Sequence, residues 1–180
     1  MDGIAIRTER VTDAVAIHAL TEAAFAPMPF ASGTEAEIVG ALRARGELTR
    51  SLVAQLDGAV GTGAGGEIVG HVAFSPVTID GHPGGWLGLG PVSVRADLQR
   101  NGIGRALIEA GLRDLEAAGA TGCALIGNPA IFRRLGFTGG TRLRYGDLDP
   151  ALVQWVSFTG EEPVGELRFA PPLEPGFAFG

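Results

Sequence analysis

The feature that most constrains the fold is a predicted strand, a glycine-containing loop and a predicted helix in direct succession over residues 92–118. Apolar residues that end at Val94 indicate the strand, and a stripe of leucines and isoleucines followed by Gly119 indicates the helix and its end. The loop reads Gln99-Arg100-Asn101-Gly102-Ile103-Gly104. Its glycines leave the backbone amides accessible, and a helix N-terminus attracts anions. The segment therefore predicts a diphosphate site, to which Arg100 and Arg105 add cationic donors.

The rest of the chain predicts further elements of one layered fold. Strands are expected near residues 4–7, 51–56, 68–79, 86–94, 121–127, 153–158 and 165–169, and helices near 13–25, 35–44, 105–118 and 129–135. This order of strands and helices indicates a mixed α/β (α+β) fold with one sheet. Pro91 lies in the middle of its strand, where a proline indicates a bulge.

A second glycine pattern, Gly61, Gly63 and Gly66, spells G-x-G-x-x-G after a predicted strand. As a dinucleotide-binding fingerprint it requires a following helix, whose N-terminus would hold the pyrophosphate. Residues 67–74 instead have the pattern of a strand. We therefore expect a lengthened hairpin loop here.

Size and composition exclude several classes of protein. The 180 residues fit one domain, 1–180, and the net charge of -6 argues against nucleic acid as a partner. No stretch is apolar enough for a membrane span and the N-terminus has no secretory pattern, so a cytoplasmic location is expected. The lone Cys123 excludes an internal disulfide and a multi-cysteine metal site, and we expect it in the core with no metal bound.

The glycine loop resembles the pyrophosphate-binding signature of the GNAT superfamily of acyl-CoA-dependent N-acyltransferases, Gln/Arg-x-x-Gly-x-Gly/Ala. Gln99, Gly102 and Gly104 match it. A second GNAT element follows over residues 125–137, a strand and then a short helix that ends in a Gly-Phe pair. Segments 70–76, 89–94 and 127–129 are similar to the bacterial YhbS-type predicted N-acetyltransferases, and the resemblance covers about residues 4–173.

The resemblance implies a single GNAT-like domain with a mixed, mostly antiparallel central sheet that is splayed between its fourth and fifth strands. Acetyl-CoA would lie in that gap as co-substrate, and its acetyl group would pass by direct attack to a primary amine of a small molecule or peptide. The protein would be a monomer or homodimer. The implied cofactor-binding residues are Val92, Ser93 and Val94 along the pantetheine arm, Gln99, Arg100, Asn101, Gly102, Ile103, Gly104 and Arg105 around the pyrophosphate, and Asn128 and Phe132 beside the thioester.

The chain departs from the family pattern at the reacting centre. Phe132 stands where many relatives have a tyrosine that protonates the CoA sulfur, and residues 86–90 lack the usual glutamate base. Three interpretations stay open: the thiolate leaves with a proton from water or another donor, another residue substitutes, or the protein binds acyl-CoA as a weak catalyst or sensor. The candidate substitutes are Ser75, His71, Tyr145 and Glu35. An unrelated fold with a fortuitous glycine loop is a further alternative.

Three of these candidates also have structural interpretations. His71 and Ser75 would share one face of a strand, where one residue of register decides whether they are buried. Glu35 follows Thr34, which with Glu37 has the pattern of a capping box at a helix start.

Overall fold

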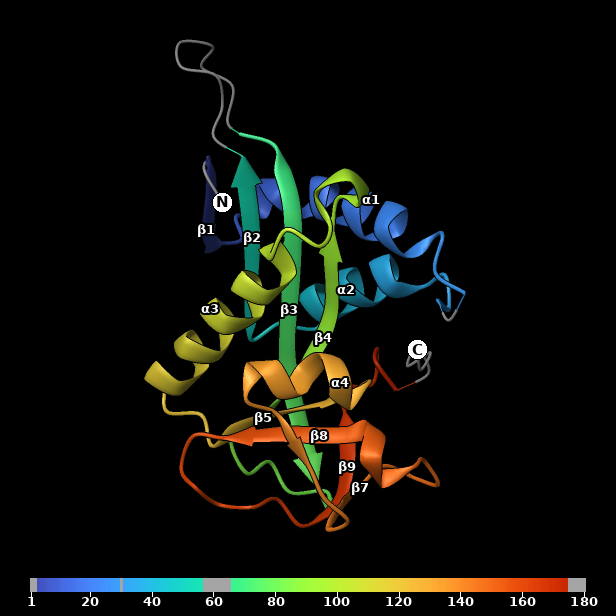
Figure 1. Cartoon of the computed structure of the whole chain (residues 1–180), viewed down its shortest axis with the longest axis vertical. Helices are drawn as coiled ribbons and strands as arrows, with labels where there is room; N and C mark the ends of the chain where they lie inside the picture. The colour runs from blue at the N-terminus through green and yellow to red at the C-terminus, as the bar shows by residue number, and fades with distance from the viewer. Residues whose placement is uncertain (1–2, 30, 57–65, 175–180) are drawn as a thin grey trace.

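The computed structural model describes residues 3–29, 31–56 and 66–174, and its described strands form one nine-stranded sheet (Figure 1). The first four strands make an antiparallel meander, in the order β1 (Ile4–Thr8), β2 (Arg50–Leu56), β3 (Ile68–Ile79) and β4 (Trp86–Val94). β5 (Gly122–Ile126) then adds in parallel to β4, and β8 (Val153–Ser157) and β6 (Thr138–Gly139) continue the sheet beyond it. The prediction of a mixed, mostly antiparallel sheet is confirmed.

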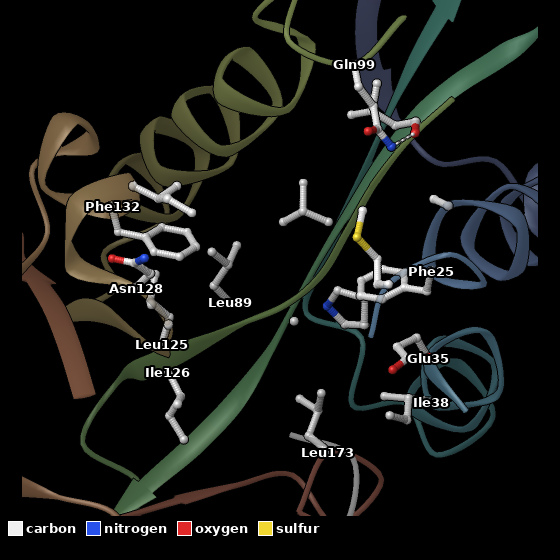
Figure 2. Close-up of a pocket in the computed structure, with 18 residues that line it drawn as sticks. Phe25, Glu35, Ile38, Leu89, Gln99, Leu125, Ile126, Asn128, Phe132 and Leu173 are labelled. Carbon is white, nitrogen blue, oxygen red and sulfur yellow. Dashed lines mark hydrogen bonds between the residues drawn. The ribbon is translucent and has the colours of Figure 1, made fainter. Parts of the chain in front are cut away.

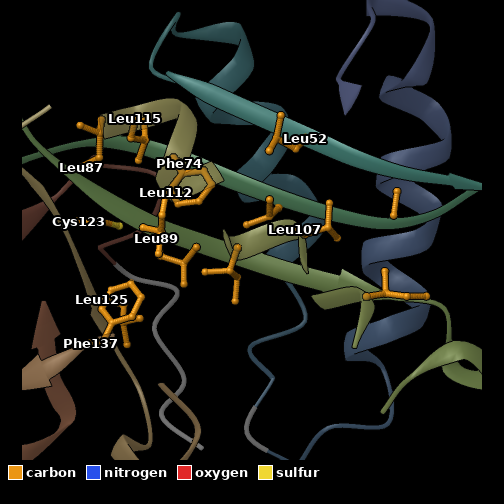
Figure 3. Packing of buried hydrophobic residues seen from close by; sticks show 14 of the residues in the cluster. Leu52, Phe74, Leu87, Leu89, Leu107, Leu112, Leu115, Cys123, Leu125 and Phe137 are labelled. Atoms are coloured by element: carbon orange, nitrogen blue, oxygen red, sulfur yellow. The ribbon is translucent and has the colours of Figure 1, made fainter. Parts of the chain in front are cut away.

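Helices cover both faces of this sheet. α3 (Ile103–Ala117) lies on one face, where Leu107 and Leu112 pack with Phe74 of β3 in the main core (Figure 3). α1 (Ala14–Phe25) and α2 (Glu35–Ala44) lie on the opposite face and bury Ile17 and Val39 against β2 and β3. Alternate side chains of β3 therefore enter different cores, as the two-residue period of a strand requires.

The sheet opens between β4 and β5. The two strands pair only over three residues, from Trp86 with Gly122 to Gly88 with Ala124, and no described strand pairs with that edge of β4 beyond Gly88. On its other edge β4 stays paired with β3, but its register shifts so that Gly90 and Pro91 lie opposite the single residue Ala73. This is the predicted bulge, and it bends β4 away from β5.

The C-terminal part of the fold was only partly predicted. β9 (Gly165–Phe169), which was predicted, pairs with the far end of β3. β7 (Leu143–Arg144), which was not predicted, pairs with β9. No structure was predicted for residues 171–174, yet Leu173 is buried. The predicted hairpin loop with Gly61 and Gly63 lies outside the described residues, but the segment after it is a strand and not a helix.

Candidate active site

A cavity of about 370 Å³ fills the gap between the diverging β4 and β5 (Figure 2). Its walls come from β4, β5, the ends of α1 and α2, and the short helix α4 (Pro129–Phe132). Most of its lining side chains are apolar, and none of the described lining residues carries a hydroxyl, thiol, imidazole or ammonium group. The polar side chains on its wall are Gln99, Asn128 and Glu35.

The N-terminus of α3 stands at one end of this cavity. The amide of Ala106 is the first in the helix to bond backwards, to the carbonyl of Gly102 at 2.9 Å. The preceding amides of Ile103, Gly104 and Arg105 have no backbone acceptor in the helix, as is general for a first turn. Together with the helix dipole they favour an anion such as a pyrophosphate.

The loop before α3 is held in a conformation that exposes its backbone. Gly102 has φ +85°, and Arg100 has φ +64°, which is uncommon for a residue with a side chain. The Gln99 side-chain Nε2 donates to the Val94 backbone carbonyl at 3.1 Å and ties the loop to the end of β4 (Figure 2). The Asn101 side-chain Nδ2 donates to the Leu98 backbone carbonyl at 3.4 Å, and the exposed Arg105 pairs with Glu109 at 2.7 Å.

β4 offers its free edge to the cavity. Val92 and Val94 line the cavity, and their backbones pair with β3 on the other side. The Ser93 side chain points away, because its buried hydroxyl donates to the Thr21 hydroxyl at 3.1 Å. The predicted contribution of these three residues to a pantetheine site is therefore through the backbone.

Asn128 and Phe132 form the opposite wall. The Asn128 carboxamide oxygen accepts from the Ala130 amide at 2.9 Å and caps α4. The Phe132 ring packs edge-on against Phe137, with 6.0 Å between ring centroids, and lies over Gly127. A β-carbon at Gly127 would approach the Phe132 ring to 2.6 Å, so this glycine makes room for the ring.

Glu35 is the one carboxylate among the described residues that line the cavity. The predicted capping box is wrong, because the Thr34 side chain makes no capping hydrogen bond. Glu35 Oε1 instead accepts from the Ser32 amide at 2.7 Å and the Ser32 hydroxyl at 3.0 Å. The residue is only 6% exposed, and Figure 2 shows its carboxylate directed into the cavity.

His71 and Ser75 lie in the interior on the α1/α2 side of β3, outside the cavity lining. His71 Nε2 is 2.8 Å from the Ser51 hydroxyl, which itself donates to Glu9. Since the single Ser51 proton goes to Glu9, Nε2 carries the proton of the ring, and the buried Nδ1 has no partner among the described residues. Burial lowers the His71 pKa to about 4, with the nearby Glu9 acting in the opposite direction.

Tyr145 and Cys123 also lie away from the cavity lining. The Tyr145 hydroxyl bonds to Glu174 at 3.4 Å, its ring packs against Phe169, and burial raises its pKa. Cys123 is fully buried as predicted, and burial raises the pKa of its thiol. Of the predicted cofactor residues, the cavity lining contains Val92, Val94, Gln99, Asn128 and Phe132. Residues 100–105 and Ser93 are not among the lining residues, and Ile103 is buried in the main core. The lining also lacks His71, Ser75 and Tyr145.

Several lining residues were missed by sequence reasoning. Phe25 and Ile38 reach the cavity from the ends of α1 and α2, and Leu173 reaches it from the C-terminal segment. Each has the pattern of an ordinary core residue, and only the packing of remote segments directs it to the cavity.

The described residues contain no group of three or more side chains suited to hold a metal ion. Within the same part of the chain, every helix is too short or too polar to cross a membrane.

Comparisons with known proteins agree with this geometry. The family model of the acetyltransferase (GNAT) domain matches residues 47–139. The uncharacterized N-acetyltransferase YhbS of Escherichia coli K12 is 36% identical over 132 residues, which are 73% of this chain and 72% of the relative. A GNAT family acetyltransferase from Brucella melitensis, whose crystal structure is a complex with acetyl-CoA, is 42% identical with a TM-score of 0.81, over 94% of this chain and 97% of the other. The structure of Escherichia coli YhbS in complex with CoA has a TM-score of 0.84 at 30% identity, over 94% and 91% of the two chains.

Proposed function

The chain belongs to the GNAT acetyltransferase family, and on that premise we propose that it transfers an acetyl group from acetyl-CoA to a primary amine. The observation that carries the proposal is the cavity at the splayed β4/β5 junction, with the first turn of α3 at one end and an apolar chamber at the other. The relatives solved with acetyl-CoA and CoA support the choice of donor.

In this proposal the chain of acetyl-CoA runs along the free edge of β4. The amides of Ile103, Gly104 and Arg105 receive the pyrophosphate, and the backbone of residues 92–94 pairs with the pantetheine amides. Phe132 and Asn128 flank the thioester. A backbone N–H at the bulge near Pro91 polarises the thioester carbonyl, in the manner of an oxyanion hole.

The reaction is a direct attack by the neutral amine on the thioester carbon. The C–N bond forms, the C–S bond breaks, and CoA leaves as a thiolate. Because a thiol has a pKa of about 8.5, the thiolate is a good leaving group and takes its proton from water or from the attacking nitrogen. The absence of a hydroxyl at Phe132 is therefore compatible with turnover.

The alternative is an acyl-CoA-binding or sensor protein with little activity. The observation that favours it is Phe132 in place of the tyrosine found in many relatives. With phenylalanine there, no described lining residue supplies a hydroxyl to the CoA sulfur. General acid–base groups typically contribute about 10²–10⁴-fold to a rate, so their loss could leave a binding protein.

A thiol-release assay separates the two functions. The protein is mixed with acetyl-CoA and a panel of primary amines, free CoA thiol is measured, and mass spectrometry identifies the acetylated product. An acetyltransferase gives amine-dependent thiol release and intersecting initial-velocity lines. Saturable binding of acetyl-CoA without amine-dependent release would support the sensor instead. A single domain over 1–180, a cytoplasmic location and a monomeric or dimeric state stay predictions.

A further inference from the structure

We propose that Glu35 is the residue that binds the acceptor ammonium and takes its proton, and that it selects a short apolar primary amine with a single positive charge. The inference rests on the proposed function, because it names the acceptor for the same cavity. It begins from the position of Glu35, which is the only carboxylate among the described residues of a mostly apolar wall.

Burial makes this carboxylate costly unless a cation joins it. Glu35 is 6% exposed, and no ion pair joins it to a cation among the described residues. A buried charge is normally paired, since desolvation penalises it strongly. An incoming ammonium would supply the missing partner.

The carboxylate is also oriented for a ligand. Ser32 occupies Oε1 with two hydrogen bonds, and no described residue donates to Oε2. The two hydrogen bonds from Ser32 fix the orientation of the carboxylate, which faces the cavity from the first residue of α2 (Figure 2). Glu37, two residues further along the same helix, is exposed and does not line the cavity.

The neighbouring side chains define what the amine carries. Phe25, Met28, Ile38, Ile126 and Leu173 surround the chamber and offer no second charge. A second ammonium or a carboxylate on the acceptor would be buried without a partner, which costs binding energy. An alkyl or benzyl group would be buried favourably.

The proton balance fits this arrangement. An acceptor that enters as R–NH₃⁺ gives one proton to Glu35, directly or through water, and becomes the nucleophile. After attack, the nitrogen releases its second proton and the CoA thiolate takes up one. Glu35 then returns its proton to solvent, so the products are the amide, CoA thiol and one free proton.

The experiment compares benzylamine, which is an ammonium at neutral pH, with aniline, which is nearly the same shape but is a neutral amine. The full-length protein, Glu35→Gln, Glu35→Asp and the matched control Glu37→Gln are assayed for thiol release and for acetyl-CoA affinity. We expect Glu35→Gln to lower kcat/KM for benzylamine about 100-fold or more, with aniline changed less than about threefold. Glu35→Asp recovers part of the loss, and Glu37→Gln behaves as the wild type.

Selectivity of the unaltered protein gives a test that does not depend on a variant folding. Benzylamine and butylamine should be used at least about tenfold better than 1,4-diaminobutane, because the second ammonium would be buried unpaired. Provided that the protein acetylates some amine, three results would each overturn the inference. They are equal use of diaminobutane, no acetylation of benzylamine, and a Glu35→Gln variant as active as the wild type. A wild-type protein that binds no acetyl-CoA and acetylates no amine would refute the proposed function itself.

Discussion

Gly104→Leu separates the stability of the fold from the binding of acetyl-CoA. Gly104 is the second residue of α3 and has an ordinary helical φ, unlike Gly102. A β-carbon at Gly104 would meet only Val94 at 3.6 Å and Val92 at 3.7 Å, which are normal contacts. A leucine there therefore fits the backbone, but its side chain extends into the space that the proposal gives to the pyrophosphate.

We expect the substitution to leave the stability of the fold intact but to weaken the binding of acetyl-CoA. Leucine is a better helix former than glycine by about 0.5–1 kcal/mol, so the free energy of unfolding should stay the same or rise slightly. Loss of two hydrogen bonds from amides to a charged phosphate costs about 1.5–3 kcal/mol each, or about 3–6 kcal/mol in total. The Kd for acetyl-CoA should therefore rise by about 10²–10⁴-fold.

Thermal unfolding with and without acetyl-CoA measures both effects. At about 100 times the wild-type Kd, the ligand stabilises the wild type by about 2.7 kcal/mol, which is roughly 5–10 °C for a chain of this size. A variant with a Kd raised 100-fold gains only about 0.4 kcal/mol. Gly104→Ala is the control, because the family signature permits alanine there, and it should bind within about threefold of the wild type. Wild-type affinity in Gly104→Leu would refute the placement of the pyrophosphate.

Three further predictions test other parts of the account. Phe132→Tyr should leave the acetyl-CoA Kd within about threefold and raise kcat in a thiol-release assay by up to about 10²-fold, since it supplies a general acid; a marked loss of binding would show that position 132 contacts a different part of CoA. Gly111→Ala should lower the free energy of unfolding in urea by about 1–3 kcal/mol, because its β-carbon would lie 2.2 Å from the Phe74 ring; an unchanged midpoint would contradict the tight packing of α3 on β3. The folded state lowers the His71 pKa to about 4, so between about pH 6.5 and 4 the unfolded chain binds more protons than the folded one. The free energy of unfolding should therefore fall by at most about 1.4 kcal/mol per pH unit as the pH drops through this range. His71→Asn should flatten that fall, and an equally steep pH dependence in the variant would argue against it.

Local sequence patterns predicted the central part of the fold well. The bulge at Pro91, the glycine loop before α3 and the start of α4 at Asn128 all have causes within a few neighbouring residues: a missing amide, a positive φ and a side-chain cap. The pairing of β9 with β3 depends on residues about ninety positions apart, and nothing local in either strand encodes it.

The same distinction explains the candidate site. The loop residues could be predicted because the proposed pyrophosphate site is a continuous segment. Glu35 was one of four candidate substitutes in the sequence, where it also had a structural interpretation at a helix start. The role now proposed for it depends on how α2 packs beside β4, which no local pattern encodes. His71 was a catalytic candidate in the sequence but lies away from the cavity. The sequence does not say which face of the sheet a strand histidine occupies, and the observed register places His71 against Ser51 in the interior.

The most direct test of the central claim is the response of backbone amide resonances to acetyl-CoA in an NMR titration of the full-length protein. We expect the amide resonances of Ile103, Gly104 and Arg105 to shift most, together with those along residues 92–94, and NAD at the same concentration to leave them in place. Shifts confined to other parts of the sheet, or equal shifts with NAD, would contradict the assignment of this cavity as the acetyl-CoA site.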